Sequence, residues 1–218
     1  MKEIFELGKF IFKFPKIIEE FNMNLVDRAK NIILNPSKEW EVIKMETISN
    51  SDLFTKYALI LAAIPAVCGF IGYSLFSISY GLFSYKLSIG SSITWAILHY
   101  LLTLGGVYVL AFIIDALAPT FGCTKDLNAA LKIAVFCYTP AWVFGVFNLF
   151  PVLSIIVLLA SIYSLILLYM GLERVKSVPK DKMVAYFIVT LIVAIVVYII
   201  IGVIINGVVF SGYYLSEF

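Results

Sequence analysis

Four long stretches of this chain carry no Asp, Glu, Lys or Arg, and they constrain the fold more than any other feature. They hold 131 of the 218 residues and lie at 57–85, 87–114, 133–172 and 183–216. A helix crosses the hydrocarbon core of a bilayer with roughly 20 apolar residues, so each run can span once and the longest can span twice. The runs lack the polar–apolar alternation of barrel strands. The sequence therefore predicts an all-α, multi-pass transmembrane protein.

Composition and motif content exclude several classes of protein. Apolar residues make up 62% of the chain and charged residues 14%, against about 45–50% and about 25% in soluble domains. The net charge of +2 is too small to favour a nucleic-acid partner. The chain has no GxxxxGK[ST] or GxGxxG motif and a single histidine, His99. Its three cysteines, Cys68, Cys123 and Cys137, have no CxxC spacing. We therefore expect reduced thiols, no metal site, no cofactor and no enzymatic activity.

Turn signals divide the uncharged runs into five spans. The Asn-Leu-Phe-Pro sequence at 148–151 is the strong turn signal near the middle of the longest run, so this run is predicted to form a hairpin of two spans. The predicted spans are 57–78, 93–117, 126–147, 151–172 and 183–207. The chain is thus expected to comprise an amphipathic helical region at 1–52, a five-helix membrane domain at 53–210 and a short extracytoplasmic tail at 211–218.

The positive charges predict an orientation. Of the 16 Lys and Arg residues, nine lie in residues 1–56, two are Lys125 and Lys132, and four lie in 173–182. Lys86 stands alone on the other side. Cytoplasmic segments carry the excess of Lys and Arg, so this split of 15 to 1 predicts a cytoplasmic N-terminus and an extracytoplasmic C-terminus. A count of four or six spans would put the basic loops on opposite sides.

The first 21 residues predict an amphipathic helix rather than a signal peptide. Apolar residues recur there at spacings of three and four, with lysines interleaved, and charges interrupt the stretch every few residues. This composition suits a helix lying in the membrane interface, although Pro15 must kink or break it. Periodicity does not distinguish lipid from protein as the covering surface, so docking on the cytoplasmic end of the bundle stays open as well.

Three polar residues lie at membrane depth. Asp115 is one turn before the end of the second predicted span and Lys132 is about one turn into the third, both roughly 6 Å inside the interface. We predict that they form an ion pair, which either joins the two helices or marks a substrate or proton path. His99, about two turns below the outer surface, is either a proton site or a histidine that is hydrogen-bonded within the bundle.

Several segments resemble a known family. They are RAKNIILNP at 28–36, DALAP at 115–119 and YTPAW at 138–142, within a resemblance that covers roughly residues 24–205. The order of these segments is similar to the prokaryotic branch of the Yip domain family, whose eukaryotic relatives are Ypt/Rab-interacting membrane proteins. The positions that carry the motifs include Pro119, Tyr138, Thr139, Pro140 and Trp142.

The resemblance implies a cytosolic N-terminus, five membrane helices, location in a prokaryotic cell membrane and no enzymatic activity. In the eukaryotic branch it implies association with prenylated Rab-type GTPases. That role is not carried over, because the N-terminus lacks the Asp-Leu-Tyr-Gly-Pro segment of some eukaryotic members.

Two functions remain open from the sequence. The first is a non-enzymatic scaffold or adaptor that binds other membrane proteins or lipids, with the bilayer, membrane proteins and a second copy of the chain as expected partners. The second is a small channel, carrier or lipid-moving protein that uses Asp115, Lys132 and His99, with kinks at Pro65 and Pro140. A transporter is expected to show an internal repeat with paired broken helices, and none is evident. The sequence therefore favours the scaffold.

Overall fold

The structure, a computed structural model, describes residues 25–76, 78–80, 83–85 and 87–215, and for 78–80, 83–85 and 210–215 it describes the backbone alone. The predicted amphipathic helix at 1–21 lies outside these residues. The helices and strands are α2 (Leu25–Leu34), α3 (Pro36–Met45), α4 (Asn50–Leu53), η1 (Phe54–Ala58), α5 (Leu59–Leu75), β1 (Ile78–Tyr80), β2 (Phe83–Tyr85), α6 (Ile89–Leu117), η2 (Ala118–Phe121), α7 (Leu127–Cys137), α8 (Thr139–Phe144), η3 (Gly145–Leu149), η4 (Pro151–Leu153), α9 (Ser154–Arg174) and α10 (Lys180–Leu215).

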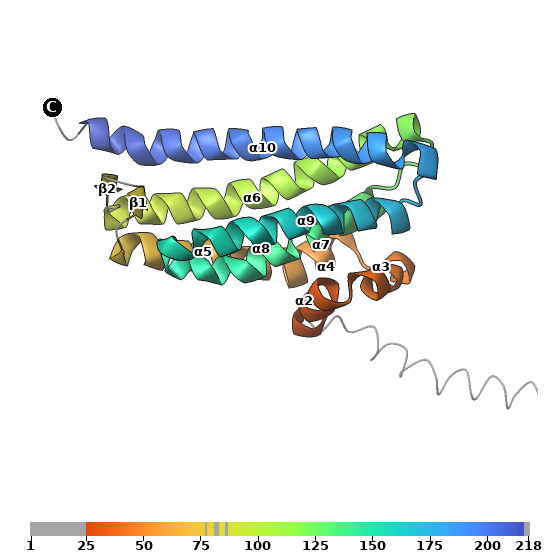
Figure 1. Cartoon of the computed structure of the whole chain (residues 1–218), viewed down its shortest axis with the longest axis horizontal. Coiled ribbons are helices and arrows are strands. Elements are labelled where there is room, and N and C mark those ends of the chain that lie inside the picture. Colours follow the sequence, from red (N-terminus) through yellow and green to blue (C-terminus); the bar gives the residue numbers. More distant parts are fainter. Residues whose placement is uncertain (1–24, 77, 81–82, 86, 216–218) are drawn as a thin grey trace, which may run out of the picture.

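Within the part of the chain that the structure describes, five helical segments are long and apolar enough to cross a membrane, which confirms the predicted count and the all-α membrane fold. They are Asn50–Leu75, Ile89–Phe121, Leu127–Leu149, Pro151–Arg174 and Lys180–Val209. The long run divides between Leu149 and Pro151, as the turn signal predicts. The segments run alongside one another, with the β1–β2 hairpin and the last turns of α10 at one end and the α9–α10 connection at the other (Figure 1).

Two helices extend beyond their predicted limits. α6 begins at Ile89 because the Ser88 side chain caps it, accepting a hydrogen bond from the Ser91 amide at 3.1 Å. α10 continues to Leu215, past the predicted end at 207 and into the predicted tail at 211–218. A single glycine such as Gly207 weakens a helix without ending it, and the uncharged sequence supplies no stop signal there.

The third span lies at the centre of the bundle and is interrupted. Its α-helix stops at Cys137 and resumes at Thr139, because Pro140 has no amide hydrogen to continue the ladder. In contrast, α5 stays one helix through Pro65. Of the most apolar part of the third span, 67% is buried inside the protein, against 11% for the last span. α10 therefore lies at the periphery, beside α6 (Figure 1).

The α2–α3 unit, residues 25–45, packs on the bundle near the end formed by the α9–α10 connection (Figure 1). Trp40 is fully buried and meets Phe136 edge-on, with ring centroids 6.4 Å apart. Its ring also lies against Gly171, where a Cβ atom would be 3.0 Å from it. The Tyr163 hydroxyl donates to the Ile33 carbonyl at 2.8 Å. These contacts join both helices of the unit to the membrane spans.

Candidate functional site

Within the described residues, two charge clusters lie near the end of the bundle that carries the α9–α10 connection, one partly exposed and one buried. The Asp115 cluster consists of Asp115, Thr124, Asp126 and Lys176. The Arg28 cluster consists of Arg28, Glu39, Glu46 and Lys132. The prediction that Asp115 pairs with Lys132 is wrong, because the two residues belong to different clusters.

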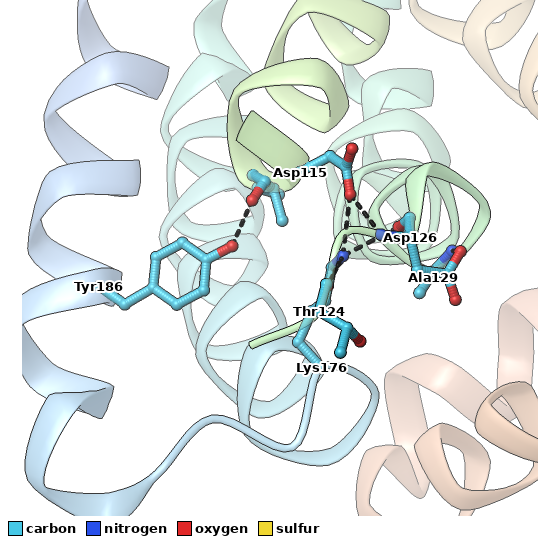
Figure 2. Close-up of polar contacts among 7 residues, drawn as sticks. Asp115, Thr124, Asp126, Ala129, Lys176 and Tyr186 are labelled. Atoms are coloured by element: carbon cyan, nitrogen blue, oxygen red, sulfur yellow. Dashed lines mark hydrogen bonds and ion pairs between the residues drawn. The ribbon is translucent and has the colours of Figure 1, made fainter. Parts of the chain in front are cut away.

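The Asp115 cluster joins α6, the η2–α7 connection and the α9–α10 connection (Figure 2). The Asp115 Oδ1 atom accepts hydrogen bonds from the Asp126 amide at 2.6 Å and from the Lys176 Nζ atom at 3.1 Å. Lys176 also donates to the carbonyls of Thr124, at 3.2 Å, and Asp126, at 2.9 Å. The Lys176 side chain is only 3% exposed, so these acceptors replace the water that its ammonium would otherwise bind.

Local sequence explains the position of this cluster. Pro119 stands in the 3₁₀ turn that follows α6, and Gly122 adopts φ 79°, a left-handed conformation that favours glycine. Asp126 then caps α7, its side chain accepting from the Ala129 amide at 3.0 Å. Beside the cluster, the Tyr186 hydroxyl of α10 donates to the Ile114 carbonyl (Figure 2).

The Arg28 cluster joins the α2–α3 unit to α7. Arg28 donates to carboxylate oxygens of Glu39 and Glu46, both at 2.5 Å, and these three side chains are at most 9% exposed. The Arg28 guanidinium carbon lies 5.7 Å from the centre of the Phe136 ring of α7. Lys132 donates to the carbonyls of Ile43, at 3.2 Å, and Glu46, at 2.5 Å. A cation thus binds the carbonyls at the C-terminal end of α3, where the helix dipole favours it.

Burial and neighbouring charges have opposite effects on the pKa of the Glu46 carboxyl. Desolvation raises the pKa of its carboxyl above the ordinary value, while the positive charges of Arg28 and Lys132 lower it. The net pKa direction is upward. The carboxylate form of Glu46 therefore depends on its two cationic neighbours.

His99 lies far from both clusters. It stands sixteen residues before Asp115 on α6, about 24 Å along the helix axis. Its ring stacks on Trp95, with centroids 4.7 Å apart and planes at 11°, and Trp95 in turn meets Tyr73 edge-on. The structure therefore does not bring His99, Asp115 and Lys132 together.

The YTPAW positions lie at the break between α7 and α8. Thr139 and Trp142 are buried, and the Thr139 hydroxyl lies 2.9 Å from the Tyr57 hydroxyl, within hydrogen-bonding distance. Tyr57 belongs to η1, a π-helical turn that precedes α5. The Tyr138 and Trp142 rings are 5.9 Å apart. The Thr139–Tyr57 contact joins the interrupted third span to η1, the turn that leads into α5.

Sequence reasoning missed Arg28, Glu39, Glu46 and Lys176 as members of the two charge clusters. A signal existed for Arg28, which stands four residues before the fully buried Ile32 and therefore on the apolar side of α2. Lys176 follows α9 in a connection where nothing in the sequence separates it from its exposed basic neighbours. Within the described residues, no group of three or more His, Cys, Asp or Glu side chains is placed to hold a metal ion.

Residues 30–205 match the Yip1 domain. The chain belongs to the Yip1 family. A similar protein is the inner membrane protein YohC of Escherichia coli K12, which is 27% identical over 165 residues, covering 74% of this chain and 85% of YohC. YohC of Escherichia coli O6:H1 matches to the same extent. No solved structure matches the chain.

The match confirms the resemblance to the Yip domain family, including a prokaryotic relative. Asp115, Lys132, Lys176, Glu39 and Glu46 all lie within the Yip1 domain. Arg28 lies just before the matched residues. In this chain the two charge clusters therefore lie in the Yip1 domain and in the segment that leads into it.

Proposed function

We propose that the protein is a non-enzymatic membrane scaffold or adaptor whose α2–α3 unit is the surface presented to partners. The observation that carries the proposal is the Arg28 cluster, which fixes this unit to α7 through buried ion pairs. Large apolar side chains nevertheless stay exposed on the same unit: Val26 is 67% exposed, Leu34 63% and Met45 74%. A fixed element with exposed apolar residues suits contact with another membrane protein or with lipid.

The contacts of the polar residues support a scaffold over a channel or carrier. Asp115 is bound by Lys176 and by a backbone amide, and Lys132 by two backbone carbonyls. His99 stacks on Trp95 at a distance from both. A transport path needs polar groups that are free to bind a substrate in succession, whereas Asp115 and Lys132 are engaged within the protein.

Photocrosslinking tests the scaffold proposal. A benzoylphenylalanine placed at Val26, Leu34 or Met45 is expected to give discrete protein adducts in native membranes, because these side chains are exposed. The matched control is Ile199 of α10, which is 56% exposed and is expected to crosslink to lipid. Adducts are identified by mass spectrometry. Lipid adducts alone at all four positions would contradict the adaptor role.

The proposed orientation has the α2–α3 unit and the α9–α10 connection in the cytoplasm and the end of α10 outside. The 15-to-1 distribution of Lys and Arg supports it. The η2–α7 and α9–α10 connections also contribute to the same cluster, which agrees with their assignment to one side.

Cysteine accessibility tests this orientation. In a variant without the native cysteines, single cysteines at Lys125 and Ser177 are expected to react only after the inner face is exposed. Cysteines at Lys86 and Leu215 are expected to react from outside. Labelling of positions 86 and 177 from the same side would contradict the five-span arrangement in the membrane.

A further inference from the structure

A shallow, open apolar groove lies along α9, with Phe187 of α10 at its side. Its volume is about 350 Å³, and its lining consists of Ile162, Leu165, Ile166, Tyr169 and Phe187. Both helices belong to membrane-spanning segments, so the groove opens at membrane depth. Water gains no hydrogen bonds from an apolar lining, so hydrocarbon is the filling that suits it. A lipid acyl chain has the matching shape and chemistry.

One end of the groove points toward the α9–α10 connection. Tyr169 and Phe187 meet edge-on there, with ring centroids 5.3 Å apart, and join the two helices. Tyr169 lies five residues before the end of α9, at a level where tyrosine hydroxyls commonly meet lipid headgroups. The headgroup of a lipid lying in the groove would therefore reach the charged end of these helices.

Two cations at this end are already engaged. Lys176 is bound to Asp115, and Arg174 donates to Glu41 at 2.8 Å. The Lys182 side chain lies beside Gly122, which follows η2. Its Nζ atom is 3.4 Å from the position that a Cβ atom would take at Gly122. The side chains of Glu173, Lys180 and Asp181 are exposed and make no hydrogen bond or ion pair among the described residues.

The helical register places these two charges in line with the groove. Glu173 follows Ile166 by seven residues on α9, and Lys180 precedes Phe187 by seven on α10. Seven residues are within about 20° of two full turns. Asp181, one position further along α10, is turned about 100° away from this line. The groove is therefore flanked at its charged end by one acid and one base.

We propose that this groove is a binding site for a phospholipid with a primary ammonium headgroup, of the phosphatidylethanolamine type. One acyl chain lies against the five lining residues. Lys180 binds the phosphate, Glu173 accepts hydrogen bonds from the ammonium, and Tyr169 is the residue at the boundary between chain and headgroup. A quaternary ammonium has no N–H to donate to Glu173, and an anionic headgroup without an ammonium leaves Glu173 unpaired. This inference does not depend on the scaffold role.

Lipid photolabelling of the full chain tests the site. The protein is reconstituted into phosphatidylcholine vesicles with a trace of phosphatidylethanolamine carrying a diazirine in its acyl chain, or with the same probe on phosphatidylcholine. We expect about five-fold more labelling of residues 162–169 and 187 by the ethanolamine probe, the size of a modest ionic preference. The combined variant Glu173→Gln and Lys180→Gln is expected to abolish the preference, while the control Asp181→Asn retains it.

Three labelling outcomes would overturn the proposal. They are equal labelling by the two probes, an unchanged preference in the combined variant, and stronger labelling by a phosphatidylglycerol probe than by the ethanolamine probe. Free phosphoethanolamine is expected not to compete, because the groove binds the acyl chain; full competition at matched concentration would assign the site to a soluble ligand and also overturn it. Ile166→Trp fills the groove and is expected to remove the labelling. Each variant must elute as the wild type does on size exclusion.

Discussion

Arg28→Met is expected to lower the free energy of unfolding by about 3–5 kcal/mol, the cost of removing one partner from a buried ion pair. The substitution leaves the carboxylates of Glu39 and Glu46 buried, each without its guanidinium partner. Protonation of Glu46, whose pKa is already raised by burial, reduces the cost toward the lower value. Unfolding of the purified protein in detergent, followed by circular dichroism, measures the change.

A matched control separates this loss from a general effect of removing a positive charge. Lys30 lies two residues away on the same helix and is exposed. Lys30→Met is therefore expected to change stability by no more than about 0.5 kcal/mol. Adding Glu46→Gln to Arg28→Met should recover part of the loss, since it removes one unpaired charge. Equal effects of Arg28→Met and Lys30→Met would contradict the buried cluster.

Lys176→Met is expected to lower the free energy of unfolding by about 2–3 kcal/mol. It deprives Asp115 of its ion pair and two loop carbonyls of their donor, while the apolar stem of the side chain is retained. The effect is smaller than at Arg28 because the Asp115 side chain is 17% exposed and keeps the Asp126 amide as a partner.

Double-mutant cycles identify the true partner of Asp115. The pair Asp115→Asn and Lys176→Met is expected to show a coupling of about 1–3 kcal/mol. The pair Asp115→Asn and Lys132→Met should be additive within about 0.5 kcal/mol, because the two residues share no contact. Coupling in the second cycle and none in the first would restore the pairing predicted from the sequence.

The membrane architecture could be predicted because it depends on long uncharged runs. Such runs fix the number of spans, and the Pro151 turn divided the longest one correctly. The end of α6 could also be predicted, because Pro119 and Gly122 are strong turn signals. The end of α10 was not, because its apolar sequence contains no stop signal strong enough to terminate a helix.

The clusters could not be predicted, because they depend on how each helix is rotated about its axis and on how the α2–α3 unit docks on the bundle. The sequence gives the depth of Lys132 along its span, but nine consecutive residues of α7 are buried, so no apolar face shows which way its side chain points. Its acceptors are the backbone carbonyls of Ile43 and Glu46. Every residue has a backbone carbonyl, so the residue types at these positions do not mark them as acceptors. For Asp115, the prediction chose Lys132 because it lies at a similar depth in the next span, whereas the cation that binds it is Lys176, sixty-one residues away.

The central claim is that buried charges hold the α2–α3 unit in place as a partner-binding surface. The most direct measurement is the yield of protein adduct from a benzoylphenylalanine at Leu34, compared between the wild type and Arg28→Met in native membranes. Equal amounts of folded protein are taken, and the lipid adduct at Ile199 serves as the internal reference. We predict that Arg28→Met loses most of the protein adduct at position 34 while the reference is unchanged. An undiminished protein adduct in Arg28→Met, alongside the unchanged reference, would contradict the claim.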